Sequence, residues 1–103
     1  MAQIAEFDSI AGNPAAPLGT VNAAGLADQT TQVTTSGTAA NTTLASDTKY
    51  VEIVEDAGKD IRVDIGDDVT ADSSAYFIAA YGSRGFHLPV SRNNDWRVSI
   101  IDA

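Results

Sequence analysis

The chain has 103 residues and carries 14 acidic side chains against six basic ones, which gives a formal net charge of −8. Phosphate backbones and anionic membrane surfaces repel so acidic a chain, and we therefore expect neither nucleic acid nor a membrane as a partner. Cysteine is absent, which excludes disulfides and thiolate metal sites. The length fits one domain with a modest core.

No apolar run approaches the roughly 18–20 residues that span a bilayer. The first eight residues also lack the basic and apolar parts of a secretory signal. We therefore expect synthesis in the cytoplasm without Sec export. A location outside the cell would then need another route, such as release inside a particle.

Residues 1–30 differ from the rest because they hold no Lys or Arg and are rich in Ala, Gly, Asn and Thr. Pro14 and Pro17 push the residues before them toward extended conformations. We predict an extended N-terminal arm over residues 1–30 that lies on a neighbouring subunit or partner. The alternative is a disordered or loosely attached tail. The apolar anchors of the arm would be Ile4, Phe7, Ile10 and Leu18.

Residues 31–103 are predicted to form one β-domain. The Thr-rich stretch 30–48 opens it, because Thr favours pleated, half-buried surfaces; a low-complexity linker is the alternative. Leu44 is expected to close the end of the sheet. Six strands are predicted, at Thr31–Ser36, Lys49–Glu55, Asp60–Ile65, Ala75–Ala80, Arg84–Ser91 and Asp95–Asp102.

Turn-forming residues separate the later strands, and no helix is available as a crossover. This favours an all-β fold, either a small antiparallel β-sandwich or a jelly-roll-like barrel of about six strands. Pro89 cannot donate a hydrogen bond to a ladder, so its strand is expected at a sheet edge.

The expected core follows from alternation with a period of two. Each such side chain contributes roughly 1.5–3 kcal/mol on burial, against ordering costs of similar total size. The domain would therefore be only marginally stable alone, which favours a homo-oligomer. The inward set is Tyr50, Val54, Ile61, Val63, Ile65, Ile78, Phe86, Leu88, Val90, Trp96, Val98 and Ile100.

Candidate catalytic groups are few. His87 is the only histidine, and the Gly-x-Ser-x-Gly elbow of a serine hydrolase is absent although Ser83 and Ser91 lie near it in sequence. Because Phe86 and Leu88 are expected to point inward, His87 is expected at the surface. We predict that the protein is not an enzyme and binds no cofactor.

A cluster of carboxylates, Asp67, Asp68 and Asp72, could supply three oxygen ligands to calcium. The spacing of an EF-hand loop is missing. A turn in which Asp side chains bond their own backbone explains the cluster equally well, and we predict no metal site.

Three arginines, Arg84, Arg92 and Arg97, lie in the C-terminal third of an otherwise acidic chain. One interpretation is that they pair with nearby Asp side chains on the surface. The other is that they face an acidic patch on a partner, since Arg is enriched in interfaces.

The order of strands resembles a known family. The first half of the pattern is a Thr-rich strand followed by Leu44-Ala-Ser-Asp-Thr-Lys-Tyr-Val-Glu-Ile-Val-Glu-Asp and Asp60-Ile-Arg-Val-Asp-Ile-Gly-Asp. The second half consists of Ala75-Tyr-Phe-Ile-Ala-Ala-Tyr-Gly, Gly85-Phe-His-Leu-Pro-Val and Trp96-Arg-Val-Ser-Ile-Ile-Asp. This pattern, over residues 30–102, resembles the small β-sandwich decoration (cement) proteins of tailed bacteriophage capsids.

The resemblance implies a non-enzymatic virion protein on the capsid exterior, made in the host cytoplasm. Such a protein binds the outer lattice, often as a trimer, and fastens neighbouring major capsid subunits; here the arm would contribute to the contact. The alternative is a phage tail or head-fibre module that contacts the host surface or a glycan. Exposed aromatic side chains such as Tyr76 or Tyr81 would then form a stacking platform.

Overall fold

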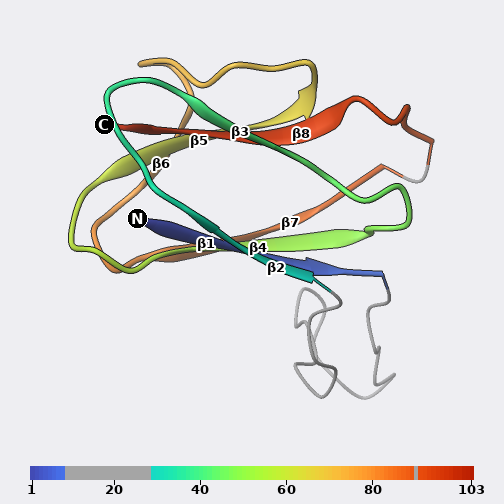
Figure 1. Ribbon diagram of the computed structural model, residues 1–103, viewed down its shortest axis with the longest axis horizontal. Coiled ribbons are helices and arrows are strands. Elements are labelled where there is room, and N and C mark those ends of the chain that lie inside the picture. Colours follow the sequence, from blue (N-terminus) through green and yellow to red (C-terminus); the bar gives the residue numbers. More distant parts are fainter. Residues whose placement is uncertain (9–28, 90) are drawn as a thin grey trace.

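The computed structural model describes residues 1–8, 29–89 and 91–103. They form a β-sandwich of two four-stranded antiparallel sheets (Figure 1). The first sheet has the strand order β2-β1-β4-β7 and the second the order β3-β8-β5-β6. The strands in this part of the chain are β1 (Ala2–Phe7), β2 (Gln29–Val33), β3 (Ala40–Thr43), β4 (Tyr50–Glu55), β5 (Ile61–Asp67), β6 (Tyr76–Ile78), β7 (Ser83–His87) and β8 (Trp96–Asp102).

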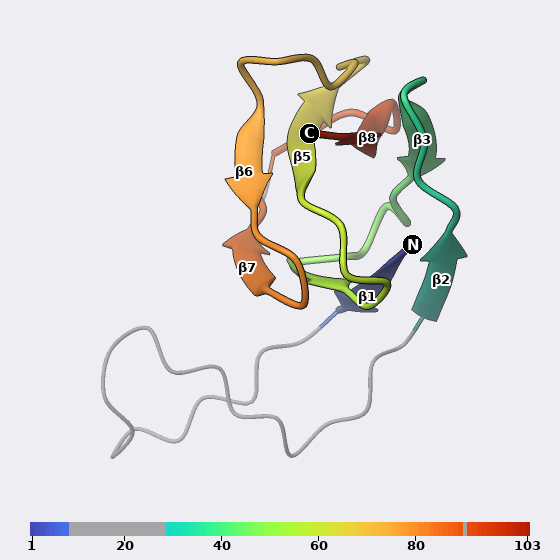
Figure 2. The same ribbon diagram turned by 90° about the vertical axis from the view of Figure 1, so that its left-hand side faces the viewer.

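The predicted antiparallel β-sandwich is confirmed, whereas the jelly-roll-like barrel is wrong, and the described residues form eight strands rather than about six. β2 and β3 are consecutive in the chain but pair in different sheets, and so do β6 and β7. Within the described residues no ladder therefore joins the sheets. Figure 2 shows β6 and β7 along one side of the sandwich and β2 and β3 along the opposite side.

β1 lies inside the first sheet, between β2 and β4. Ile4 pairs with Thr31 of β2 on one side and with Ile53 of β4 on the other. The prediction of an arm over residues 1–30 is therefore wrong for β1 and for the start of β2. The alternation in β1 was too weak to predict a strand, because Ile4 is its only large apolar residue that points inward. Residues 9–28 of the predicted arm lie outside the described residues.

The core lies between the two sheets and consists mostly of β-branched side chains. Each of these contributes roughly 1.5–3 kcal/mol relative to leaving it exposed. Leu44 is also buried, as predicted. The large aliphatic side chains that are almost fully buried are Ile4, Val51, Ile53, Ile61, Val63, Val98 and Ile100.

The inward face of β4 is the opposite of the predicted one. Val51 and Ile53 are fully buried in the core, whereas Tyr50 and Val54 share the outer face with the exposed Glu52. Because side chains alternate along a strand, an error in the choice of the inward face exchanges all the inward and outward residues of that strand. The structure uses the face that ends in Glu55 rather than the face that carries the aromatic ring.

Two buried glutamates lie on the inner face of the first sheet, near opposite ends of the core. Glu6 pairs with Val51, and Glu55 pairs with Ala2. One Glu6 oxygen, Oε1, accepts hydrogen bonds from the backbone N–H of Ala45 (2.9 Å) and from the hydroxyl of Thr48 (2.8 Å). Glu6 thereby fixes the connection from β3 to β4, where the chain passes from the second sheet to the first.

Candidate functional site

Three aromatic side chains are exposed at one side of the sandwich, on β6 and on the connection from β6 to β7. The exposed fractions are 49% for Tyr76, 46% for Phe77 and 75% for Tyr81. Tyr, Phe and Arg side chains are enriched in protein interfaces. We call these three residues, together with Arg62 and Arg84, the aromatic edge.

The alternation of β6 sends its two aromatic rings to opposite faces. Tyr76 pairs with the buried Val63 and therefore lies on the inner face, where its ring meets Phe86 of β7 edge-to-face with the centroids 5.7 Å apart. The Arg84 guanidinium lies 4.3 Å from the centre of the Tyr76 ring and donates a hydrogen bond to its hydroxyl. These contacts join the outermost strands of the two sheets.

Phe77 lies on the outer face of the second sheet beside Arg62. The Arg62 guanidinium carbon lies 5.4 Å from the centre of the Phe77 ring, and Nη1 of Arg62 donates to the Ala75 carbonyl (2.9 Å). An arginine stacked on an exposed ring has its orientation set before any partner arrives.

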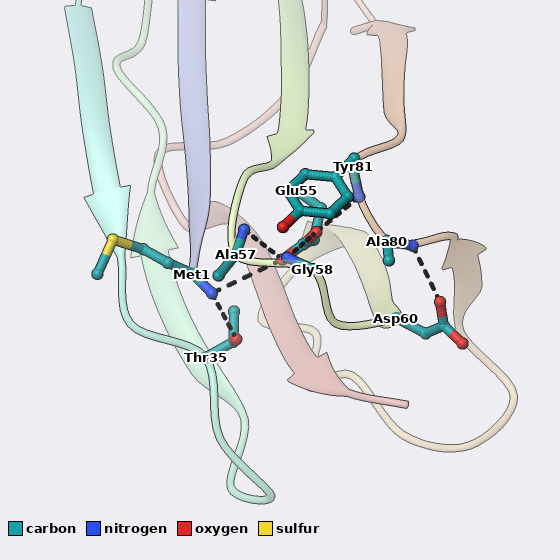
Figure 3. A network of polar contacts seen from close by, with 8 residues as sticks. All are labelled: Met1, Thr35, Glu55, Ala57, Gly58, Asp60, Ala80 and Tyr81. Atoms are coloured by element: carbon teal, nitrogen blue, oxygen red, sulfur yellow. Dashed lines mark hydrogen bonds and ion pairs between the residues drawn. The ribbon is translucent and has the colours of Figure 1, made fainter.

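Tyr81 has a left-handed backbone with φ of 60°. This region costs a residue with a Cβ roughly 1–2 kcal/mol, so neighbouring contacts must hold it. The Glu55 carboxylate accepts the Tyr81 N–H at 2.7 Å, and Asp60 accepts the N–H of Ala80 at 2.9 Å (Figure 3). The Tyr81 ring lies against Gly58, where a Cβ would come within 2.9 Å of the Tyr81 hydroxyl oxygen.

Glu55 connects the turn between β4 and β5 with the turn that carries Tyr81. Besides Tyr81, its carboxylate accepts the N–H groups of Ala57 (2.8 Å) and Gly58 (3.0 Å). Burial alone would raise the pKa of Glu55, but hydrogen bonds from the backbone of Tyr81, Ala57, Lys59 and Gly58 outweigh it and lower the pKa to about 2. The carboxylate is therefore ionised at neutral pH while it holds the turn that presents Tyr81.

A cavity of about 400 Å³ opens beside the aromatic edge. Its apolar wall combines side chains of both sheets, and Ser74 and Asp64 lie at its polar part. A concave site of this size with few polar groups suits one or two inserted apolar side chains. The apolar lining residues are Val63, Ile65, Ala75, Tyr76 and Phe86.

The structure separates the predicted partner-binding residues of the N-terminal segment. Ile4 is fully buried within the core, so its assignment as an anchor on an exposed arm is wrong. It faces inward because it pairs with the inward-facing Ile53. Phe7 is half-buried and its ring lies 5.8 Å from that of Tyr50. Ile10 and Leu18 lie outside the described residues.

The three predicted arginines do not form one group. Arg84 belongs to the aromatic edge, whereas Arg92 donates to the carbonyls of Ala45 (2.7 Å) and Ser46 (3.2 Å) and stabilises the connection before β4. Arg97 forms an ion pair with Asp68 (3.3 Å). Contacts within the chain thus engage Arg92 and Arg97, and their role toward a partner stays a prediction.

The carboxylates of the 67–72 stretch also have local contacts. Asp67 accepts the side-chain amide of Asn93 (2.9 Å). Hydrogen bonds from the hydroxyl and the backbone of Ser74 lower the pKa of Asp72. Among the described residues, no three His, Cys, Asp or Glu side chains are placed to hold a metal ion. His87 is exposed, and its ring packs edge-on against Tyr50 with centroids 5.0 Å apart.

No family model, curated protein or solved structure matches this chain. The resemblance to phage decoration proteins therefore depends on the residue pattern alone. In the part of the chain that the structure describes, no helix is long and apolar enough to cross a membrane.

Sequence reasoning named Arg84 and, within the glycan alternative, the exposed Tyr76 and Tyr81, but it did not combine them with Phe77 and Arg62. The consecutive Tyr76 and Phe77 carried a usable signal, because a strand cannot bury both rings on one face. The roles of Glu55 and of the Tyr81 backbone had no such signal. Both depend on a turn and a strand end that meet only in the folded chain.

Proposed function

We propose that this protein is a non-enzymatic virion structural protein, a decoration or cement protein of a tailed-phage capsid. It binds the outer capsid lattice and fastens neighbouring major capsid subunits. The observation that carries the proposal is the aromatic edge, because Tyr, Phe and Arg side chains exposed together have the composition of protein interface centres. The residue pattern of 30–102 supports the same class.

The contact is expected to centre on Tyr81, whose N–H is held by the Glu55 carboxylate, and on Phe77, which lies beside Arg62. Ordering costs at an interface fall when the binding side chains are already fixed. The trimeric state and a contribution from residues 9–28, including Ile10 and Leu18, remain predictions within this proposal.

The test is binding of the purified chain to capsid shells assembled from the major capsid protein encoded with it. We expect cosedimentation with the shells, density on their outer surface by cryo-electron microscopy, and a higher temperature of shell disruption. Tyr81→Ala should weaken cosedimentation about tenfold, as expected for a central aromatic contact. Gln32→Ala, an exposed change on the opposite side of the sandwich, is the matched control. Absence of binding by the unmodified chain would refute the proposal.

A second candidate is a tail or head-fibre module that binds a glycan on the host surface. It is favoured by the 75% exposure of the Tyr81 ring, which offers a face for stacking against a sugar. A glycan array separates the two functions. Binding to a defined glycan that is lost in Tyr81→Ala, together with virion density at the tail, would favour this candidate over the capsid.

A further inference from the structure

β7 is an outermost strand of the first sheet, and its register shows which of its backbone groups are free. Glu55 N–H donates to the Gly82 carbonyl (2.9 Å), and Leu88 N–H donates to the Lys49 carbonyl (2.9 Å). In an antiparallel pair such bonded positions recur at every second residue. The carbonyl of Gly82 and the backbone groups of Arg84, Phe86 and Leu88 therefore point toward β4.

The alternate residues, Ser83, Gly85 and His87, direct their N–H and C=O groups away from the sheet. All three are exposed, and no described strand lies on that side of β7. Unpaired backbone groups in a row are a template for pairing with another chain. Such a row is complementary to a polypeptide backbone in particular.

The outer strand on the opposite side of the same sheet provides a comparison. Asp56 N–H donates to the Met1 carbonyl (3.2 Å), so odd-numbered residues of β1 face β4 and even-numbered ones face β2. The register then leaves only Thr30 and Gln32 of β2 with outward backbone groups. β2 is Gln- and Thr-rich, whereas β7 adjoins the aromatic edge.

The 400 Å³ cavity lies against β7, because Phe86 is in its wall. A strand added beside β7 would point every second side chain to the inner face, where Phe86 and Tyr76 lie. In strand addition the main chain supplies affinity and pockets for alternate side chains supply specificity. β7 offers both features.

We propose that β7 is a strand-addition site: an extended segment of a partner polypeptide pairs with Ser83–His87 and extends the first sheet to a fifth strand. The segment carries an apolar side chain that enters the cavity and a carboxylate that meets Arg84. Arg84 is exposed, and within the described part of the chain no carboxylate lies within ion-pairing distance of it.

The partner is a different polypeptide and not a second copy of this chain. The β7 strand of a second copy, Ser83–His87, carries no carboxylate to meet Arg84. Edge-to-edge pairing of two β7 strands about Gly85 would also bring the two Arg84 side chains to the same face. The partner segment is taken to belong to the major capsid protein, and to that extent the inference rests on the proposed function.

The first test is hydrogen exchange of the full chain, free and bound to capsid shells, with release by acid quench and readout by NMR. In the free chain the amides of Ser83, Gly85 and His87 should exchange fast and those of Arg84 and Phe86 slowly. On the shells the three fast amides should slow by about tenfold or more, whereas Thr30 and Gln32 stay fast. Protection at β2 instead, or none on β7, would overturn the inference.

The second test uses proline at a backbone N–H that points away from the sheet. Ser83→Pro keeps the ladder with β4 but removes an outward donor and blocks an approaching strand, so binding to shells should weaken about tenfold. Thr30→Pro makes the same change on β2 and should leave binding unchanged. Thermal unfolding of both variants checks that each is folded; equal binding of folded Ser83→Pro and Thr30→Pro would overturn the inference.

The outcomes separate the two proposals. Shell binding without protection of β7 removes the strand-addition site and leaves the decoration function standing. No shell binding by the unmodified chain refutes the decoration function, and with it the assigned partner. If the chain forms dimers in solution and Ser83→Pro converts them to monomers, the partner at β7 is a second copy. That result would overturn the choice of a different polypeptide.

Discussion

Gly85 is the position in β7 where the smallest substitution should have a large effect. It pairs with Glu52, and the Tyr50 ring reaches across it diagonally on the outer face of the first sheet. A Cβ at residue 85 would overlap the Tyr50 hydroxyl oxygen and lie 2.5 Å from the carbon that bears it. Gly85→Ala therefore forces the Tyr50 ring out of its place.

The expected loss of unfolding free energy follows from the burial and the ring contact that Tyr50 would lose. Tyr50 is only 8% exposed. Displacing the ring would expose on the order of 100 Å² of mostly apolar surface, worth about 2.5 kcal/mol. Its edge contact with His87 would add about 0.5–1 kcal/mol. We expect Gly85→Ala to lower the free energy of unfolding by about 3 kcal/mol.

A double-mutant cycle tests the cause, with urea unfolding as the assay. In a Tyr50→Val background the Cβ at residue 85 meets no ring, and Ala should be more stable than Gly in a strand by about 0.5–1 kcal/mol. Gly37→Ala is the matched control, because a Cβ there would have no atom within 4 Å. A loss under about 1 kcal/mol, or the same loss in both backgrounds, would refute the packing of Tyr50 over Gly85.

Three further predictions concern the aromatic edge. The folded-state pKa of Glu55, about 2, lies below its ordinary value of 4.5, so Glu55 stabilises the fold above pH 4.5 and this contribution is lost as pH falls toward 2. Thermal unfolding as a function of pH should show this loss, and Glu55→Gln should flatten the curve in that range; an unchanged curve contradicts the role of the carboxylate. Tyr81→Gly should keep or raise the unfolding free energy, by up to about 1 kcal/mol, because glycine tolerates the positive φ. The same change should weaken shell binding, and a folded variant that binds normally would exclude Tyr81 from the contact. Arg84→Lys should weaken shell binding about fivefold with little change in unfolding temperature, because lysine cannot reproduce the planar stack on Tyr76; equal binding by cosedimentation contradicts the role of Arg84.

Strong period-two alternation predicted the inward faces of β5, β7 and β8. β5 and β8 appear close to their predicted positions, and Ile61, Val63, Val98 and Ile100 point inward as expected. Phe86 and His87 also take the predicted opposite faces of β7. In these strands most large apolar residues occupy one face, and this decides which face is expected to point inward.

β4 shows why alternation fails when both faces carry apolar residues. Its sequence offers Tyr50 and Val54 on one face and Val51 and Ile53 on the other. Each face also carries one glutamate, Glu52 or Glu55, so charge does not decide between them. The backbone N–H groups of Ala57, Gly58 and Tyr81 compensate the burial of the Glu55 charge, and they are contributed by turns up to 26 residues away. The weakly apolar β1 and β3 were missed for a related reason, since their partners rather than their own residues make them strands.

The candidate site was less predictable because its geometry depends on backbone rather than on residue type. The sequence Tyr81-Gly82 indicates a turn in which the glycine has the positive φ. In the structure Tyr81 has the positive φ instead. The exposure of Tyr81 is therefore a consequence of how Glu55 and Asp60 hold the turn.

The buried Glu55 also links the two parts of the proposed binding surface. Its carboxylate accepts the Tyr81 N–H, and its own N–H donates to the Gly82 carbonyl, one residue before the first free backbone position of β7. One residue thus fixes both the ring that projects from the aromatic edge and the start of the strand with unpaired groups. A partner that meets this side need not order either element, which lowers the entropic cost of binding. The burial of this charged side chain is consistent with that role, since packing alone gives no reason to place a carboxylate in a core built mostly of Val and Ile.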